Sequence, residues 1–239
     1  MSLKTVLITR TQPGAQRSAA RAKAEGFLPE ILPALELKEI PVVFPEAAFT
    51  GGLIFTSPNA VLFAPRAPFR SASAVFCVGD ATAIAAQQAG FENIKSAKGD
   101  SDALVMFIRD QWSLHDGSLL QLGNEAPSGN VEEKLSAQGY DIQSIATYKT
   151  VTPATFTQAL RDRLASDLRL DIITAYSPAC ADAIADAVAG WSEIGNVKLP
   201  MFVAISSNAA KPLKNIKQAK VKIALQPNEN EMIKAFQFA

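Results

Sequence analysis

Short apolar runs alternate with alanine-rich helical stretches along most of the chain. Residues 5–8 are a continuous run of β-branched and leucine side chains, and a Thr-Gln-Pro turn then opens a helix that extends through residue 23. Apolar runs without polar alternation are typical of parallel strands that helices cover on both faces. The pattern therefore predicts an α/β fold built from βαβ units.

A glycine followed by an aromatic residue closes three of the predicted helices. The pairs stand at positions 26–27, 90–91 and 139–140, and each precedes an apolar run. Glycine tolerates the positive φ that ends a helix, and the next apolar residue folds back onto the last turn. The sequence thus predicts the order helix, glycine, strand in three copies.

The number of predicted strands favours two sheets over one. Because a sheet usually holds about four to six strands, ten strands suit two sheets of about five. A weak repeat supports this, since residues 55–60 resemble residues 175–180 and residues 75–83 align with residues 202–210. We therefore expect duplicated doubly wound lobes. The predicted strands are residues 5–8, 30–37, 52–56, 74–79, 93–96, 118–123, 141–148, 171–175, 200–205 and 220–225.

Composition narrows the classes of function. The 239 residues are 48% hydrophobic and carry 23 basic and 23 acidic side chains, so we expect a large core and no broad basic surface for nucleic acid. No stretch predicts a membrane span or a secretory signal, and a cytoplasmic protein without a membrane partner is expected. Cys77 and Cys180 are too few for a disulfide framework and are expected to be small buried hydrophobes.

The positions where ligands bind in parallel sheets carry small polar residues. Such ligands bind beyond the carboxyl ends of strands, where backbone N–H groups at helix starts can hold carboxylate or phosphate. Helix capping is the simpler explanation for any single turn, and only several turns facing one cleft would favour anion binding. The candidate turns are residues 9–11, 56–59, 79–82, 123–124, 177–178 and 206–208.

Common catalytic motifs are absent from the sequence. We find no GxSxG elbow, Walker loop or HExxH, no GxGxxG after the first strand, and no metal-ligand spacing. The one histidine, His115, lies in a polar loop and is expected to be a solvated surface residue. Tyr148 stands where a strand leaves one predicted lobe for the other. Its simpler interpretation is an interface aromatic with a packed ring and a solvated hydroxyl.

Five strings along the chain carry a family resemblance, at residues 6–10, 53–61, 75–83, 119–124 and 146–151. They resemble the uroporphyrinogen-III synthase family and occur in that family's order. The resemblance implies a monomer of two flavodoxin-like lobes with doubly wound parallel sheets, an interleaved chain and a two-stranded linker. Residues 1–37 and 153–239 would form one lobe and residues 44–147 the other, with linkers at residues 38–43 and 148–152. The strings are VLITR (6–10), LIFTSPNAV (53–61), VFCVGDATA (75–83), LLQLGN (119–124) and ATYKTV (146–151).

The resemblance also implies a lyase of haem biosynthesis that needs no cofactor. It would convert hydroxymethylbilane, supplied by porphobilinogen deaminase, into uroporphyrinogen III with inversion of ring D and loss of water. Because this substrate closes unaided to the wrong isomer, the expected task is to orient a flexible polyanion. Tyr148 matches the family tyrosine proposed to assist departure of the hydroxyl. By resemblance, by turn position or by charge, the expected substrate contacts are Arg10, Thr56, Ser57, Asn59, Gly79, Asp80, Thr82, Gly123, Asn124, Lys149, Ser177, Ser207 and Asn208.

One segment departs from the family pattern and keeps alternatives open. Residues 205–210 read ISSNAA where the family has IGPTTA, so Ala209 replaces the threonine equivalent to Thr82. Either Ser207 and Asn208 supply the lost hydrogen bonds, or this lobe binds carboxylates differently, or activity is reduced. A second hypothesis is therefore a catalytically degenerate paralogue that binds a tetrapyrrole or another anion. A third, a signalling domain phosphorylated at Asp80, lacks an acidic partner cluster near the first strand.

Overall fold

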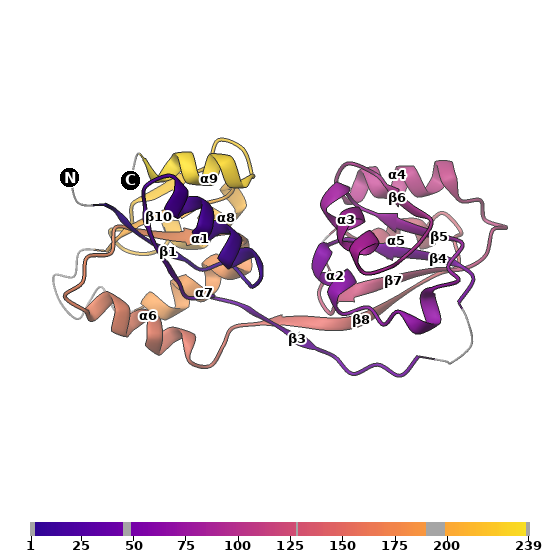
Figure 1. Ribbon diagram of the computed structural model, residues 1–239, viewed down its shortest axis with the longest axis horizontal. Coiled ribbons are helices and arrows are strands. Elements are labelled where there is room, and N and C mark those ends of the chain that lie inside the picture. The colour runs from indigo at the N-terminus through magenta and orange to yellow at the C-terminus, as the bar shows by residue number, and fades with distance from the viewer. Residues whose placement is uncertain (1–2, 45–48, 128, 190–198, 238–239) are drawn as a thin grey trace. The chain divides into compact units, whose positions relative to one another are not determined.

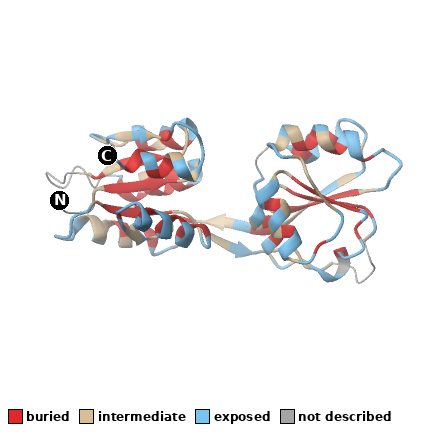
Figure 2. Cartoon of the chain, turned by 45° about the horizontal axis from the view of Figure 1, so that its top comes forward, coloured by how far each residue is buried: buried red, intermediate tan, exposed pale blue. Residues whose placement is uncertain are grey.

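The chain divides into two compact units that are described separately. The computed structural model describes residues 3–44, 49–127, 129–189 and 199–237. Unit 1 is Met1–Glu36 with Val151–Ala239, and unit 2 is Leu37–Thr150 (Figure 1). In each unit a sheet of largely buried strands lies between more exposed helices (Figure 2).

Unit 1 contains a five-stranded sheet in the order β11-β10-β9-β1-β2, in which every neighbouring pair is parallel. One face packs against α6, α7 and α8, and the other face packs against α1 and α9. Its strands are β1 (Thr5–Ile8), β2 (Leu28–Ile31), β9 (Ile172–Ala175), β10 (Met201–Ala204) and β11 (Val221–Ile223). Its helices are α1 (Gly14–Ala24), α6 (Phe156–Ala165), α7 (Pro178–Val188), α8 (Ser207–Lys214) and α9 (Glu229–Phe236).

Unit 2 contains a six-stranded sheet in the order β3-β8-β7-β4-β5-β6. The neighbours from β8 to β6 are parallel, with α2 and α3 on one face and α4 and α5 on the other. Its strands are β3 (Glu36–Glu39), β4 (Gly52–Phe55), β5 (Ala74–Cys77), β6 (Ile94–Ser96), β7 (Leu119–Asn124) and β8 (Ile142–Val151). Its helices are α2 (Pro58–Leu62), α3 (Asp80–Gln88), α4 (Ser101–Gln111) and α5 (Val131–Ser136), with the short 3₁₀ helix η1 (Ala67–Phe69).

The expected α/β architecture with parallel sheets is confirmed, but one predicted strand is wrong. Residues 30–37 form parts of two strands, β2 and β3, which lie in different sheets. After β2 the amides of Leu32 and Ala34 still bond the carbonyls of Ile8 and Thr9, at 3.0 and 2.9 Å. Beyond Ala34 the chain leaves the first sheet, and β3 pairs with β8 in the second sheet.

The three glycine helix ends are confirmed. Gly26, Gly90 and Gly139 have φ of +85°, +83° and +88°. In each case the following aromatic residue donates its N–H to the carbonyl five residues earlier, over 3.0–3.2 Å, which is the bond that defines a Schellman motif. The partners are Phe27 with Ala22, Phe91 with Ala86, and Tyr140 with Leu135.

The internal repeat is visible as two equivalent strand-to-helix turns. Ser57 after β4 and Ser177 after β9 both have φ of −160°, and each caps its helix. Their hydroxyls accept the N–H groups of Ala60 and Cys180 at 3.1 and 3.2 Å. The alignment of residues 75–83 with residues 202–210 also holds, since it superposes the N-caps of α3 and α8.

Candidate functional site

The neighbouring strands β4, β5 and β7 are parallel and in register, so their carboxyl ends lie at the same end of the unit 2 sheet. This end is called the carboxyl edge of the sheet. The turn after β4, the start of α3 after β5 and the end of β7 therefore share this edge. Seven of the predicted substrate contacts are brought together there: Thr56, Ser57, Asn59, Gly79, Asp80, Gly123 and Asn124.

Tyr148 reaches the same edge through an irregularity in β8. Gly123 of β7 is paired with Ala146, whereas Asn124 is paired with Tyr148, so Thr147 is an extra residue. Such a bulge breaks the two-residue alternation of side chains and can redirect one of them. Tyr148 is consequently buried in the core beside α2, with 5% of its surface exposed.

Two contacts of the Tyr148 phenol bear on its chemistry, one on its ring face and one at its hydroxyl. Its ring is stacked on Phe63, with the centroids 5.0 Å apart and the planes at 21°. Its hydroxyl lies 3.3 Å from the Ser57 Oγ, and either oxygen can be the donor. Burial raises the pKa of Tyr148 above its ordinary value, while the contact with Ser57 lowers it by less. The phenol is therefore protonated at neutral pH and its proton lies at the sheet edge.

Ser57 holds this arrangement because its hydroxyl has two partners. The oxygen accepts the Ala60 N–H as the α2 cap, which leaves its proton free for the Tyr148 oxygen. Pro58 follows at the first helical position, where its fixed φ favours helix initiation. The short helix ends before Phe63, so α2 places Ser57 and Phe63 at its two ends, and both contact Tyr148.

Asn124 fastens the end of β7 to β8. Its side-chain nitrogen donates to the Thr150 hydroxyl at 3.1 Å, and the next amide, Glu125 N–H, donates to the Tyr148 carbonyl at 2.9 Å. Gly123 is buried, and a Cβ there would meet no atom within 4 Å. Lys149 is exposed and forms no salt bridge within the described parts of the chain.

At the start of α3, a ligand could be bound by backbone N–H groups more readily than by side chains. Gly79 is the N-cap, and Asp80 is exposed and accepts the Ser96 hydroxyl at 2.8 Å. Thr82 is only 2% exposed, and Ala209, its equivalent in unit 1, is completely buried. The departure from the family pattern at Ala209 therefore falls at a position that exposes little surface in either unit.

Four predicted contacts lie in unit 1, at the carboxyl ends of β1, β9 and β10. Arg10 follows β1, but its guanidinium is paired with Glu229 Oε2 at 2.7 Å and lies 5.1 Å from the Tyr176 ring centroid. Tyr176 is also 3.3 Å from Glu229 Oε1, and burial, followed by the charge of Glu229, raises the pKa of its phenol. The charge of Arg10 is thus engaged within the protein.

The remaining unit 1 candidates divide into a capping residue and two exposed ones. Ser177 caps α7, as described above. The cap of α8 is Ser206, whose hydroxyl accepts the Ala209 N–H at 3.3 Å. Ser207 and Asn208, the predicted contacts, are exposed residues of the first turn.

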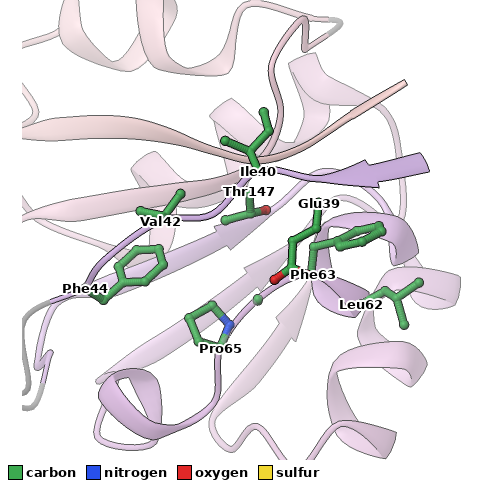
Figure 3. A pocket seen from close by; sticks show the side chains of 9 residues that line it. Glu39, Ile40, Val42, Phe44, Leu62, Phe63, Pro65 and Thr147 are labelled. Carbon is green, nitrogen blue, oxygen red and sulfur yellow. The ribbon is translucent and has the colours of Figure 1, made fainter. Parts of the chain in front are cut away.

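A cavity of about 470 Å³ in unit 2 lies beside this site (Figure 3). Phe63 lines it, as does Thr147, the extra residue of β8, and the rest of the lining is mainly apolar. Neither this cavity nor the role of Phe63 in its wall could be predicted from local sequence, because both depend on which residue of β8 meets α2. Its lining residues are Glu39, Ile40, Val42, Phe44, Leu62, Phe63, Ala64, Pro65 and Thr147.

The other predicted features lie away from this edge. His115 is exposed in a turn, and Cys77 and Cys180 are buried free thiols, as expected. The described residues contain no group of three or more His, Cys, Asp or Glu side chains able to hold a metal ion. Every helix in the described ranges is too short or too polar to cross a membrane.

Solved structures with the same fold come from two bacteria. Uroporphyrinogen-III synthetase from Helicobacter pylori matches with a TM-score of 0.64 and 16% identity over 100% of both chains. A mutant uroporphyrinogen III synthase from Thermus thermophilus matches with a TM-score of 0.55 and 15% identity, over 99% of this chain and 98% of the other. These similarities define the class as a two-unit α/β protein of the uroporphyrinogen-III synthase fold.

Sequence comparison identifies the family. The family model described as uroporphyrinogen-III synthase HemD matches residues 16–234. The chain therefore belongs to the uroporphyrinogen-III synthase family, whose members are lyases of haem biosynthesis. A comparison with curated protein sequences finds no match.

Proposed function

We propose that this protein closes hydroxymethylbilane to uroporphyrinogen III, with inversion of ring D and release of one water. Family membership over residues 16–234 supports the reaction. The observation that carries the mechanism is the partly buried contact between the hydroxyls of Tyr148 and Ser57 at the carboxyl edge of the unit 2 sheet. It supplies one protonated group of fixed direction in a site otherwise lined by small polar residues.

Tyr148 acts as a general acid in this proposal. Its proton passes to the terminal hydroxyl of the substrate, which leaves as water and gives an azafulvene cation. Ring D attacks through its substituted carbon to form a spiro intermediate, which fragments and recloses inverted. The proton that the ring carbon then loses restores the phenol, so the overall change is loss of one water. Ser57 donates to the phenol oxygen and stabilises its charge while the proton is absent.

We assign the binding of substrate carboxylates to backbone N–H groups at helix starts. The starts of α3, α7 and α8 supply such groups, and the helix dipoles favour negative charge there. Gly79, Ser177, Ser207 and Asn208 belong to this binding role, and Asn124 is proposed as a further contact at the end of β7. Because Glu229 already neutralises Arg10, we assign to Arg10 a structural role within unit 1. Lys149 is then the exposed cation among the predicted substrate contacts.

The remaining expectations from the family resemblance are part of the same proposal. They are handover of hydroxymethylbilane by porphobilinogen deaminase, action as a monomer, and a cytoplasmic location. The family resemblance is their support.

A coupled assay tests the function. Porphobilinogen deaminase generates hydroxymethylbilane in the presence of this protein, the products are oxidised, and isomers I and III are separated. We expect isomer III to dominate, because unaided closure gives isomer I. A product containing isomer I alone, as in the control without the protein, would reject the proposal and favour the degenerate binding paralogue.

A further inference from the structure

Phe63 covers one face of Tyr148 and is itself held by α2. Its backbone N–H donates to the Asn59 carbonyl at 3.4 Å at the end of the helix. The ring centroids of Phe63 and Tyr148 lie 5.0 Å apart, with the planes at 21°. The same short helix begins at Ser57, which contacts the Tyr148 hydroxyl. Residues at both ends of helix α2 therefore contact the Tyr148 phenol.

We propose that Phe63 is a positioning residue for the reaction, whose ring fixes the direction in which the Tyr148 hydroxyl points. The inference rests on the proposed role of Tyr148 as the proton donor. A buried phenol with one hydroxyl partner can still tilt about its side-chain bonds, and the near-parallel stack opposes that tilt. Such control matters because a displacement of about 1 Å at a catalytic group can cost about a hundredfold in rate.

The cavity explains why this ring is needed. Phe63 forms part of the wall of the 470 Å³ cavity (Figure 3), and the same ring is stacked on Tyr148. A smaller aliphatic residue at position 63 would let the phenol tilt into this space and let water approach it. The same space gives room for an indole ring, so tryptophan can replace Phe63 and keep an aromatic face against Tyr148.

Phe44 provides a matched control. It is also partly buried, belongs to the edge of the same core cluster and lines the same cavity. Its ring contacts Phe69 edge-on, with the centroids 5.2 Å apart. Phe44→Leu therefore repeats the loss of an aromatic wall residue while the stack on Tyr148 stays intact.

The experiment measures isomer III formation and the phenol titration in the full-length chain. For Phe63→Leu we expect kcat to fall about tenfold or more with KM within about twofold, and for Phe44→Leu we expect nearly unchanged kcat. Phe63→Trp should recover most of the loss. Phe63→Met fills a similar volume without an aromatic face, and serves if the leucine variant does not fold.

The second readout separates positioning from general loss of structure. The ultraviolet titration of Tyr148 is obtained by difference from Tyr148→Phe in the same background. Because water then reaches the phenol, Phe63→Leu should titrate at lower pH than the wild type, and the alkaline limb of the kcat profile should move with it. The Phe44→Leu titration should stay in place.

Three outcomes decide the matter. A drop in kcat with the expected titration shift, reversed by tryptophan, supports the proposal. Unchanged kcat and titration in folded Phe63→Leu, with an active wild type, would overturn it. If the wild type itself forms no isomer III, the proposed function fails, and an unchanged Tyr148 titration in Phe63→Leu would separately overturn the inference about the ring.

Discussion

Tyr148 meets three requirements of a proton donor through ordinary packing. Its ring is buried in the core of unit 2, its hydroxyl lies at the sheet edge, and Ser57 is close enough to share a hydrogen bond. Burial raises its pKa, so the acid form is kept over the whole neutral range. Such a phenol can donate a proton at neutral pH without a charged neighbour.

Replacing Tyr148 by phenylalanine tests that role at the level of one atom. The stack on Phe63 survives in this variant, and only the hydroxyl and its contact with Ser57 are lost. We expect kcat to fall by about a hundredfold or more, while the free energy of unfolding changes by about 1 kcal/mol or less. Initial rates of isomer III formation and urea unfolding measure the two quantities. Wild-type turnover by the folded variant would remove Tyr148 from the mechanism.

Cys77 makes stability depend on alkaline pH. It is completely buried, and burial raises the pKa of its thiol to about 12. An unfolded cysteine ionises near pH 8.5, so the unfolded state loses its proton first and stability falls as pH rises above that value. Between about pH 7 and pH 9.5, Cys77 should therefore account for a loss of about 1.4 kcal/mol.

Cys77→Ala should lack this part of the pH dependence. Unfolding of unit 2 can be followed by the fluorescence of Trp112, a buried residue of that unit, after Trp191→Phe removes the second tryptophan. Urea unfolding at both pH values gives the loss of stability for each protein. Equal losses in the two proteins would show that the Cys77 thiol does not carry the effect.

Among the elements, the strand-to-helix turns could be predicted from the sequence, whereas the pairing of strands could not. Ser-Pro after an apolar run predicts an N-cap and a helix start, and both copies of this turn have the expected backbone. The break between β2 and β3 was missed, because residues 30–37 are apolar enough for one strand and only the partners β1 and β8 distinguish its parts. Local sequence patterns indicate helices and strands, whereas the pairing with neighbouring strands in the sheet determines where a strand ends.

The glycine that follows α3 allows the cost of backbone strain to be predicted with little steric interference. Gly90 has φ of +83°, and a Cβ there would meet no atom within 4 Å. Gly90→Ala should thus lose about 1 kcal/mol of stability from backbone strain alone, and Gly90→Asn should lose less because asparagine tolerates this conformation. Urea unfolding measures both, with the exposed helical change Gln88→Ala as a control near zero. A neutral alanine variant would contradict the explanation.

The start of α7 allows capping and substrate binding to be separated. Aspartate caps a helix as well as serine does, so Ser177→Asp should keep the free energy of unfolding within about 0.5 kcal/mol. The added negative charge should nevertheless raise KM several-fold if a substrate carboxylate binds there. Gln138→Glu adds the same charge at an exposed turn that precedes β8. If both variants have the wild-type KM, no carboxylate is bound at α7.

Over the whole molecule, basic and acidic side chains balance, so binding of an anionic substrate depends on local contacts. With 23 basic and 23 acidic side chains the chain has no net charge to attract a polyanion from a distance. We therefore expect kcat/KM to change by about threefold or less between low and high ionic strength. Steady-state rates over a series of salt concentrations measure this. A fall of about tenfold or more would show that long-range attraction contributes after all.

The candidate site illustrates which contacts between distant residues can be predicted from the sequence and which cannot. The resemblance pointed to Tyr148 and Ser57, which the structure places 3.3 Å apart although 91 positions separate them. It did not point to Phe63, because nothing near residue 63 records that a bulge at Thr147 turns a distant tyrosine toward it. The run of small polar residues at positions 206–208 likewise does not show where α8 begins, and the structure identifies Ser206 as its capping residue.

The position of β1 has a consequence for how the protein is made. This strand lies between β2 and β9, and all of unit 2 separates β1 from β9 in the chain. During translation, unit 2 therefore leaves the ribosome while β1, a fully apolar strand apart from Thr5, still lacks one neighbour. An unpaired apolar edge is prone to aggregation. A nascent chain of this protein is accordingly most in need of a chaperone in the interval before β9 emerges.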